Sequence, residues 1–186
     1  MIIADGMGGH PRGDWASKSA IDAILSGWQT SSPLIDAFQA VNAAHGALIA
    51  DARGAPRPGS TVAAAVIYRE SCTFFNVGDS PILYWRDGNI EELSTKDRAS
   101  EEDKNILSQC IGGWADDTPQ PHIGEQKLNA GDKIILMTDG VADHISDDEL
   151  RRLLEGSRVN LASNVCGQAR KNGSDDDTSV IIAHID

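Results

Sequence analysis

The fold class follows from one stretch in the middle of the chain, residues 61–77, which reads TVAAAVIYRESCTFFNV. Residues 61–68 form a continuous apolar run with β-branched side chains, and residues 72–77 form a second such run. Runs of this length and composition are typical of buried strands. Because only a short polar turn separates them, we predict that they pair as an antiparallel hairpin.

A second hairpin is predicted directly after the first. Its strands, 82–86 and 89–93, flank Asp87-Gly88, which is the strongest short hairpin signal in the sequence. Asp-Gly pairs are turn formers first of all, so we assign this aspartate to the turn and not to a site. Two successive hairpins indicate that an antiparallel sheet lies at the centre of the domain.

Helical patterns lie on both sides of this β-rich block. We predict helices at 14–27, 33–49, 147–155 and 160–171. We predict further strands at 1–4, 122–128, 133–138 and 178–185, a loop at 52–60, and an amphipathic piece at 105–111 within the polar segment 94–120. Because helices and hairpins are segregated along the sequence, we expect one α+β layered domain, residues 1–186, and not a doubly wound parallel sheet.

The composition restricts the possible partners and location. The 186 residues include 28 acidic and 16 basic side chains, which gives a formal net charge of −12. Nucleic acid and anionic membrane surfaces are disfavoured as partners, because binding them requires a basic surface. No apolar run approaches the roughly 18 residues of a membrane span, and no signal-type leader is expected. Three scattered cysteines, Cys72, Cys110 and Cys166, have neither disulfide nor zinc spacing, which favours a reducing, cytoplasmic compartment.

Aspartates lie at the boundaries of three predicted strands. Asp5 follows the run 1–4, Asp139 follows the run 133–138, and Asp175-Asp176-Asp177 precedes the final strand. A solvated acidic surface explains any single one of them. A desolvated carboxylate is unfavourable unless it is neutralised, however, and a divalent cation could neutralise several at once.

The donor atoms indicate which metal would bind. Carboxylate and carbonyl oxygens select hard cations, so Mg²⁺ or Mn²⁺ is expected before Zn²⁺. Glycines beside Asp5 let the backbone approach an ion, which makes the Gly6 carbonyl a candidate ligand. Two such ions would lower the pKa of a shared water molecule and hold a phosphoryl group for in-line attack. This mechanism needs no nucleophilic side chain, and the sequence has no Ser-His-Asp grouping, Gly-x-Ser-x-Gly elbow or P-loop.

Seven short segments, in order along nearly the whole chain, form a common pattern. They are Ala4–His10 (ADGMGGH), Gly59–Val62, Asn76–Ser80, Tyr84–Gly88, Leu93–Asp97, Leu136–Val141 and Asp175–Thr178. Each segment alone has little specificity. Taken in this order, they resemble the motifs of the metal-dependent serine/threonine protein phosphatases of type 2C, in their bacterial form.

The resemblance implies a four-layer αββα sandwich, in which two packed antiparallel sheets are flanked by helices, with a dinuclear Mn²⁺ or Mg²⁺ site at one end. By analogy, Asp5 would bridge the two metals and the Gly6 carbonyl would bind the first. Asp139 and Asp175 would hold the second metal. Catalysis would then depend on Asp5, Asp139 and Asp175 through a water molecule held by the metals.

Three further aspartates have counterparts in the family. Asp97 resembles the carboxylate that some bacterial members use for a third metal ion. Asp79 matches a position that is more structural than ligating. Asp176 stands where relatives usually have asparagine after the last metal aspartate, which adds negative charge near the second metal.

The implied activity is hydrolysis of phosphoserine and phosphothreonine in proteins, opposing a serine/threonine kinase. Relatives begin with an upstream strand that carries a phosphate-binding arginine and an acidic metal ligand. Because Met1 lies just before the first matched segment, we expect a chain that is short at its N-terminus and assign no substrate-binding residue. The alternative is a docking or regulatory module with little turnover. A purely structural Ca²⁺ or Mg²⁺ site is a third reading, which no EF-hand-like loop supports.

Overall fold

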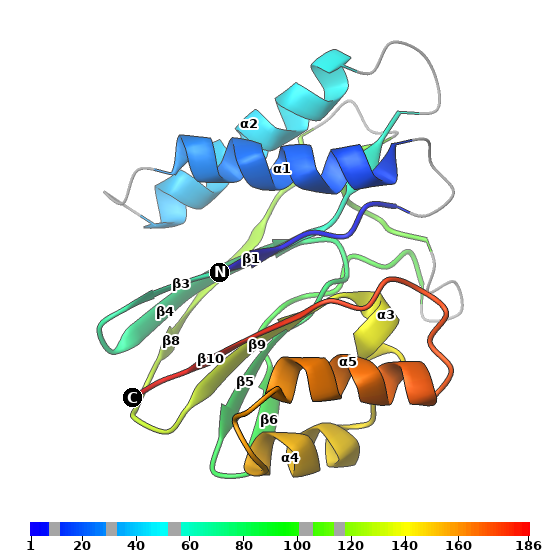
Figure 1. Ribbon diagram of the computed structural model, residues 1–186. Coiled ribbons are helices and arrows are strands. Elements are labelled where there is room, and N and C mark those ends of the chain that lie inside the picture. Colours follow the sequence, from blue (N-terminus) through cyan, green and yellow to red (C-terminus); the bar gives the residue numbers. More distant parts are fainter. Residues whose placement is uncertain (8–11, 29–32, 52–56, 101–105, 114–117) are drawn as a thin grey trace.

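The computed structural model has four layers, with two sheets packed face to face and helices on both outer sides (Figure 1). It describes residues 1–186 except 8–11, 29–32, 52–56, 101–105 and 114–117, and the side chains of 33–35 and 51 are also outside the description. Helices α1 (Gly13–Gly27) and α2 (Pro33–Asp51) cover one sheet. Helices α4 (Asp147–Glu155) and α5 (Leu161–Lys171) cover the other. The expected αββα architecture is therefore confirmed.

Both large sheets are antiparallel throughout. The first has the order β1-β3-β4-β8, with strands Ile2–Ile3, Val62–Tyr68, Ser71–Val77 and His122–Lys127. The second has the order β10-β9-β5-β6, with strands Val180–His184, Lys133–Met137, Ile82–Arg86 and Asn89–Glu92. A small sheet pairs β2 (Gly59–Ser60) with β7 (Ile111–Gly112), and a short helix, α3 (Asp139–Ala142), follows β9.

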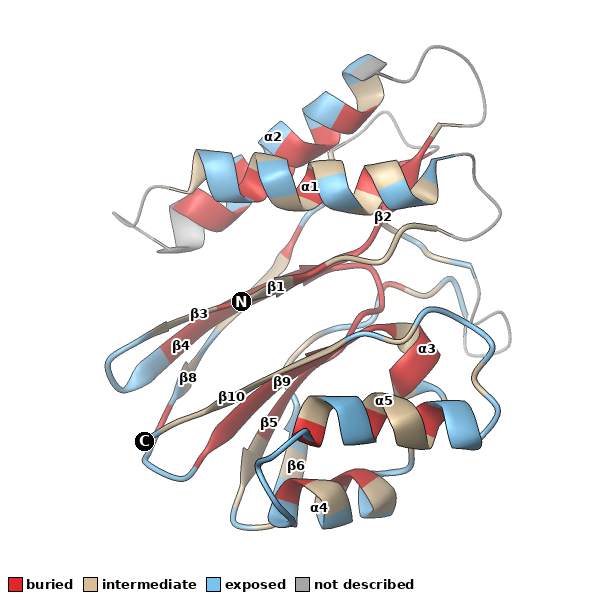
Figure 2. Cartoon of the chain, viewed as in Figure 1, coloured by how far each residue is buried: buried red, intermediate tan, exposed pale blue. Residues whose placement is uncertain are grey.

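Strand β9 is buried along its whole length (Figure 2). Its apolar side chains alternate between two separate core layers. Ile134 and Leu136 pack between the two sheets. Ile135 and Met137 point to the other face and pack under α4 and α5. Since successive side chains of a strand point to opposite faces, a strand buried on both faces appears in the sequence as a continuous apolar run. None of the helices in the described part of the chain combines the length and apolar character needed to cross a bilayer.

Local signals explain why two of the predicted elements form where they do. The turn between β5 and β6 places Asp87 at φ 49° and Gly88 at φ 82°, and positive φ at both positions suits an Asp-Gly hairpin. Helix α4 begins with a capping box, in which the Ser146 hydroxyl accepts from the Glu149 N–H and the Glu149 carboxylate accepts from the Ser146 N–H. Both the hairpin and this helix have their predicted positions.

The connections differ from the expectations in two places. The segment predicted as a loop at 52–60 ends in strand β2, because its last two residues pair with β7; residues 52–56 lie outside the described residues. The predicted amphipathic piece also begins outside them, at 105, and ends in β7. Strands β8 and β9 follow each other in the sequence but belong to different sheets. The turn between them therefore joins the two sheets and does not close a hairpin.

Candidate metal centre

The loops that follow β1, β4 and β9 and the loop that precedes β10 lie at one end of the sandwich (Figure 1). They carry four aspartates, three of which raise the pKa of the fourth, Asp5, through their charge. Asp5 follows β1, Asp79 follows β4, Asp139 is the first residue of α3 after β9, and Asp176 lies in the loop before β10. Strands β9 and β10 are antiparallel neighbours, so the last residues of β9 and the first residues of β10 lie at the same end of the sheet. Segments far apart in the sequence are thus brought together by the sheet topology.

Hydrogen bonds to the neighbouring strand segment fix the backbone of Asp5. The Asp5 N–H donates to the Thr61 hydroxyl at 3.0 Å. The Asp5 carbonyl accepts from the Ser60 hydroxyl at 2.9 Å and from the Thr61 N–H at 2.8 Å. Two residues later, the Met7 N–H donates to the Gly59 carbonyl at 3.0 Å. The loop after β1 is therefore tied to β2 and to Thr61, which fixes the backbone from which the Asp5 carboxyl group extends.

Two glycines allow α1 to begin directly against this loop. A Cβ atom on Gly6 would lie 2.0 Å from the Gly13 carbonyl oxygen, so no side chain fits there. A Cβ atom on Gly13 would lie 3.2 Å from the Gly6 carbonyl oxygen. The Gly6 carbonyl thus lies beside the first turn of α1 and one residue from Asp5, where it remains a candidate ligand.

Asp5 and Asp139 form the centre of the cluster. Of the neighbouring charges, that of Asp139 acts most strongly on the Asp5 carboxyl group. Within the described part of the chain, the Asp5 Oδ2 atom is buried and has no hydrogen-bond partner. Burial raises the pKa of Asp5 well above its usual value, and the charges of Asp139, Asp176 and Asp79 raise it further. No lysine or arginine among the described residues forms an ion pair with Asp5 or Asp139, so the pair is an uncompensated acidic site.

The last aspartate group contributes Asp176 to this site. Asp176 is among the main charges that raise the Asp5 pKa, and its neighbour Asp175 is not. The chain at 176–177 also packs against Gly140, where a Cβ atom would lie 3.1 Å from the Asp176 Cβ and 2.5 Å from the following carbonyl oxygen. The segment 176–177 therefore packs against Gly140 of α3, next to Asp139, and the ligand predicted from the family pattern, Asp175, directly precedes it.

Asp97 is buried in a network of protein hydrogen bonds, with 5% of its surface exposed. Its Oδ2 atom accepts from the Gly78 N–H at 2.8 Å. Its Oδ1 atom accepts from the Gln109 side chain at 2.9 Å and contacts His122 Nε2 at 2.8 Å. Through these bonds Asp97 joins the end of β4 to the start of β8 and to the segment before β7. Its role as a ligand of a third metal ion stays a prediction.

Asp79 is bonded to an arginine that the sequence reasoning did not single out. Arg98 Nε donates to Asp79 at 2.9 Å, and Arg98 Nη2 donates to both oxygens of Asp143 at 3.2 and 3.0 Å. This arrangement agrees with a structural position for Asp79. The spacing of Asp139 and Asp143, four residues apart at a predicted strand end, is the signal that could have placed both on one side of a helical turn.

The donor chemistry of the cluster fits a hard divalent cation, although its ligands are not drawn together as a closed shell. Asp5 and Asp139 meet, whereas Asp79 and Asp176 act on Asp5 through charge alone. Among the described residues, no three His, Cys, Asp or Glu side chains are already placed to hold a metal ion. The unpartnered Asp5 oxygen and the shared burial are what a cation would satisfy. Residues 8–10 of the first matched segment lie outside the described residues.

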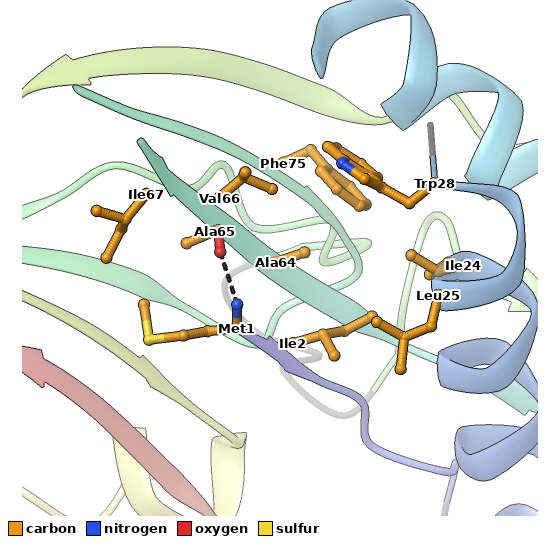
Figure 3. A pocket seen from close by; sticks show the side chains of 10 residues that line it. All are labelled: Met1, Ile2, Ile24, Leu25, Trp28, Ala64, Ala65, Val66, Ile67 and Phe75. Carbon is orange, nitrogen blue, oxygen red and sulfur yellow. Dashed lines mark hydrogen bonds between the residues drawn. The ribbon is translucent and has the colours of Figure 1, made fainter. Parts of the chain in front are cut away.

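A cavity of about 450 Å³ lies elsewhere, between α1 and the β1 edge of the first sheet (Figure 3). Its walls are mostly apolar, and Trp28 stacks on Phe75 with ring centroids 5.9 Å apart. The Met1 amino group, which donates to the Ala65 carbonyl at 2.8 Å, is already bonded. Because no lysine or arginine among the described residues lines this cavity, it does not suit a phosphoryl group. The acidic end of the sandwich is the better candidate for the active site.

Comparisons with known proteins show the family to which the chain belongs. The family model described as Protein phosphatase 2C matches residues 1–171. A putative protein phosphatase 2C-type from Streptococcus pyogenes serotype M6 is 28% identical over 87% of this chain and 74% of its own length. The serine/threonine protein phosphatase PstP of Mycobacterium tuberculosis is 24% identical over all of this chain, which spans 40% of PstP.

Solved structures share the fold along the full length of the chain. The serine/threonine phosphatase of S. agalactiae matches with a TM-score of 0.89 at 23% identity, over 100% of this chain and 86% of that one. The catalytic domain of PstP in complex with two manganese ions matches with a TM-score of 0.86 at 25% identity, over 100% and 87%. Sequence, fold and family model agree, and the chain belongs to the protein phosphatase 2C family.

Proposed function

We propose that this chain is a metal-dependent protein serine/threonine phosphatase whose active site is the acidic end of the sandwich. The observation that carries the proposal is the Asp5 carboxyl group, whose Oδ2 atom is buried and has no partner among the described residues. The charge of Asp139 acts on it, and no described lysine or arginine forms an ion pair with it. A protein keeps two carboxyl groups in contact at such a place only when something else neutralises them.

The roles of the residues follow from their positions. Asp5 and Asp139, already in contact, would hold two Mn²⁺ or Mg²⁺ ions between them, with the Gly6 carbonyl on one side and Asp176 on the other. When bound, such ions would acidify a water molecule and neutralise phosphoryl oxygens. The hydrogen bonds from Ser60 and Thr61 hold the Asp5 backbone, so its carboxylate need not reorganise during the reaction.

The relatives support the choice of metal and substrate. PstP has been solved with two manganese ions, and several similar proteins are named serine/threonine phosphatases. We therefore propose phosphoserine and phosphothreonine esters in proteins as substrates, made by a serine/threonine kinase. The net charge of −12 also favours protein partners over nucleic acid, because binding nucleic acid requires a basic surface.

Hydrolysis of a phosphothreonine peptide by the purified chain tests this proposal. Turnover should require Mn²⁺ or Mg²⁺, stop in EDTA and return when Mn²⁺ is restored. Asp139→Asn should remove it, whereas Asp87→Asn, an equivalent change in the remote β5–β6 turn, should not. Equal turnover with and without metal would contradict the proposal. A folded chain with no metal-dependent turnover would favour the alternative of a docking module.

A further inference from the structure

One cation is built into the acidic end of the sandwich. Arg98 lies just after the matched segment 93–97, and its side chain is 12% exposed. It spans two carboxylates that come from different elements, with Nε on Asp79 after β4 and Nη2 on Asp143 after α3. Among the described residues, these are the ion pairs that touch the loops of the candidate metal centre.

The partners of Arg98 are coupled to the centre itself. The charge of Asp139 raises the pKa of Asp79, and the charge of Asp79 contributes to raising the pKa of Asp5. Asp143 is fixed to the same short helix as Asp139, because its N–H donates to the Asp139 carbonyl at 2.9 Å. Arg98 is therefore linked to the Asp5–Asp139 pair through two carboxylates, those of Asp79 and Asp143.

The energetics show that the arginine is held as a charged group. Burial opposes the charge on Arg98, but its bonds to Asp143 and Asp79 outweigh burial and leave its pKa above the usual value. Burial also raises the pKa of Asp79, and the bond from Arg98 opposes that rise. Without the guanidinium, a carboxylate that is 4% exposed would face Asp139 with no cation bonded to it.

We propose that Arg98 is a positioning residue that serves as a fixed internal cation of the metal centre. It offsets one of the two negative charges of Asp79 and Asp143 and occupies their oxygens, which leaves the remaining carboxylates for divalent metal. The inference rests on the proposed function, since it takes the Asp5–Asp139 pair as the metal site. By this inference, Arg98 limits both the affinity for metal and the number of metal ions bound at this end of the molecule.

The inference predicts opposite effects for two substitutions. Arg98→Ala removes one positive charge beside the centre, so Mn²⁺ should bind more tightly or in greater number. Asp143→Asn removes one negative charge and leaves Arg98 in place, so Mn²⁺ should bind more weakly. Because solvent and salt screen the interaction between the altered charge and the metal ion, each change should alter the half-saturating Mn²⁺ concentration by only roughly tenfold.

The test measures Mn²⁺ binding by calorimetry, and the melting temperature with and without Mn²⁺, on metal-stripped protein; no turnover is needed. Arg86→Ala is the matched control, because Arg86 also binds an aspartate through Nε and Nη2, at the opposite end of the molecule. Without metal, Arg98→Ala should lower the melting temperature by roughly 5–10 °C. Arg98→Lys keeps the positive charge but cannot bond both aspartates through two separate nitrogens. It should restore the wild-type Mn²⁺ response.

The expected result is a larger Mn²⁺-induced rise in melting temperature for Arg98→Ala than for wild type, a smaller one for Asp143→Asn, and no change in that rise for Arg86→Ala. If Arg98→Ala matches Arg86→Ala, or if both changes at the centre act in the same direction, the inference is wrong. Should Arg98→Ala fail to fold, Asp143→Asn decides alone: an unchanged or tighter Mn²⁺ affinity overturns the inference. Failure of the proposed function would instead appear as wild-type protein without metal-dependent turnover.

Discussion

An aspartate lies at each end of strand β9, and the two are accommodated in opposite ways. Before the strand, Asp132 is 2% exposed and accepts hydrogen bonds from Tyr84, from Arg86 and from the Asn129 N–H. The Arg86 guanidinium holds the pKa of Asp132 below its usual range. After the strand, Asp139 meets Asp5, and no described lysine or arginine pairs with either.

The contrast separates stability from function within one sheet. At the Asp132 end, the chain supplies its own cation, and every carboxylate oxygen has a partner. At the Asp139 end, an Asp5 oxygen has none in the described part of the chain. Since burying an unpaired charged carboxylate is unfavourable, the second arrangement calls for either a proton on Asp5 or a bound cation. This difference in local neutralisation supports the proposal that the Asp139 end is the active site.

The largest expected effect comes from Asp139→Asn. It should lower kcat/KM for a phosphothreonine peptide by more than about 100-fold, because a metal ligand is lost. The metal-free protein should unfold at the same or a higher temperature, since one of two facing carboxylates becomes neutral. A clear fall in the melting temperature of the metal-free variant would mean that this end is built for stability, and the contrast would disappear.

A paired substitution distinguishes the two candidate ligands in the loop before β10. Asp176→Asn should lower kcat/KM by roughly 10- to 100-fold and raise the Mn²⁺ requirement. Asp175→Asn should change neither by more than about twofold, because Asp175 is not among the main charges acting on Asp5. Steady-state kinetics over a Mn²⁺ series checks both, and the reverse order would restore the ligand predicted from the family pattern.

The opposite end should respond in stability and not in activity. Asp132→Asn should lower the melting temperature at pH 7 by roughly 4–8 °C, because Arg86 loses its charged partner. The folded pKa of Asp132 is lowered, so its stabilisation is present above the ordinary aspartate pKa and is lost as pH falls through the folded value. The gap between wild type and variant should therefore stay constant from about pH 5 to 8 and narrow below about pH 4. A gap that instead widens on acidification would contradict this assignment.

The smallest effect is expected from Ser146→Ala, which touches neither end of β9. Loss of the α4 cap should cost about 1 kcal/mol of unfolding free energy. Denaturant unfolding with and without Mn²⁺ should show the same loss in both conditions. A metal-dependent loss would show that the outer helices, and not only the strand ends, are coupled to the metal centre.

Much of the layered fold could be predicted from local signals. The hairpin turn at Asp87-Gly88 and the helix 147–155 have their own sequence chemistry, so propensity and structure agree there. The separation of β8 and β9 into different sheets could not be predicted, because no local pattern records which sheet a strand joins. Strand β2 was missed since a two-residue bridge carries no periodicity.

The site was predictable only as a set of strand-end aspartates. Asp5 and Asp139 are adjacent to clear apolar runs, and the structure brings them into contact. Residues 175–177 are three aspartates in succession, so the sequence pattern does not show which side chain faces the site. The choice of Asp175 or Asp176 as the ligand depends on how the loop packs on Gly140. The two carboxylate partners of Arg98, Asp79 and Asp143, are far from it in the sequence and are brought to it only by the fold. Its role could therefore not be predicted from the sequence.

The most direct test is Mn²⁺ binding to metal-stripped wild type and Asp5→Asn, followed by calorimetry and thermal unfolding. The wild type should bind Mn²⁺ and gain melting temperature with rising concentration, as expected for a ligand specific to the folded state. Asp5→Asn should stay folded and lose most of that response. If the wild type binds no Mn²⁺, or if both proteins respond equally, the buried carboxyl pair is not a metal site.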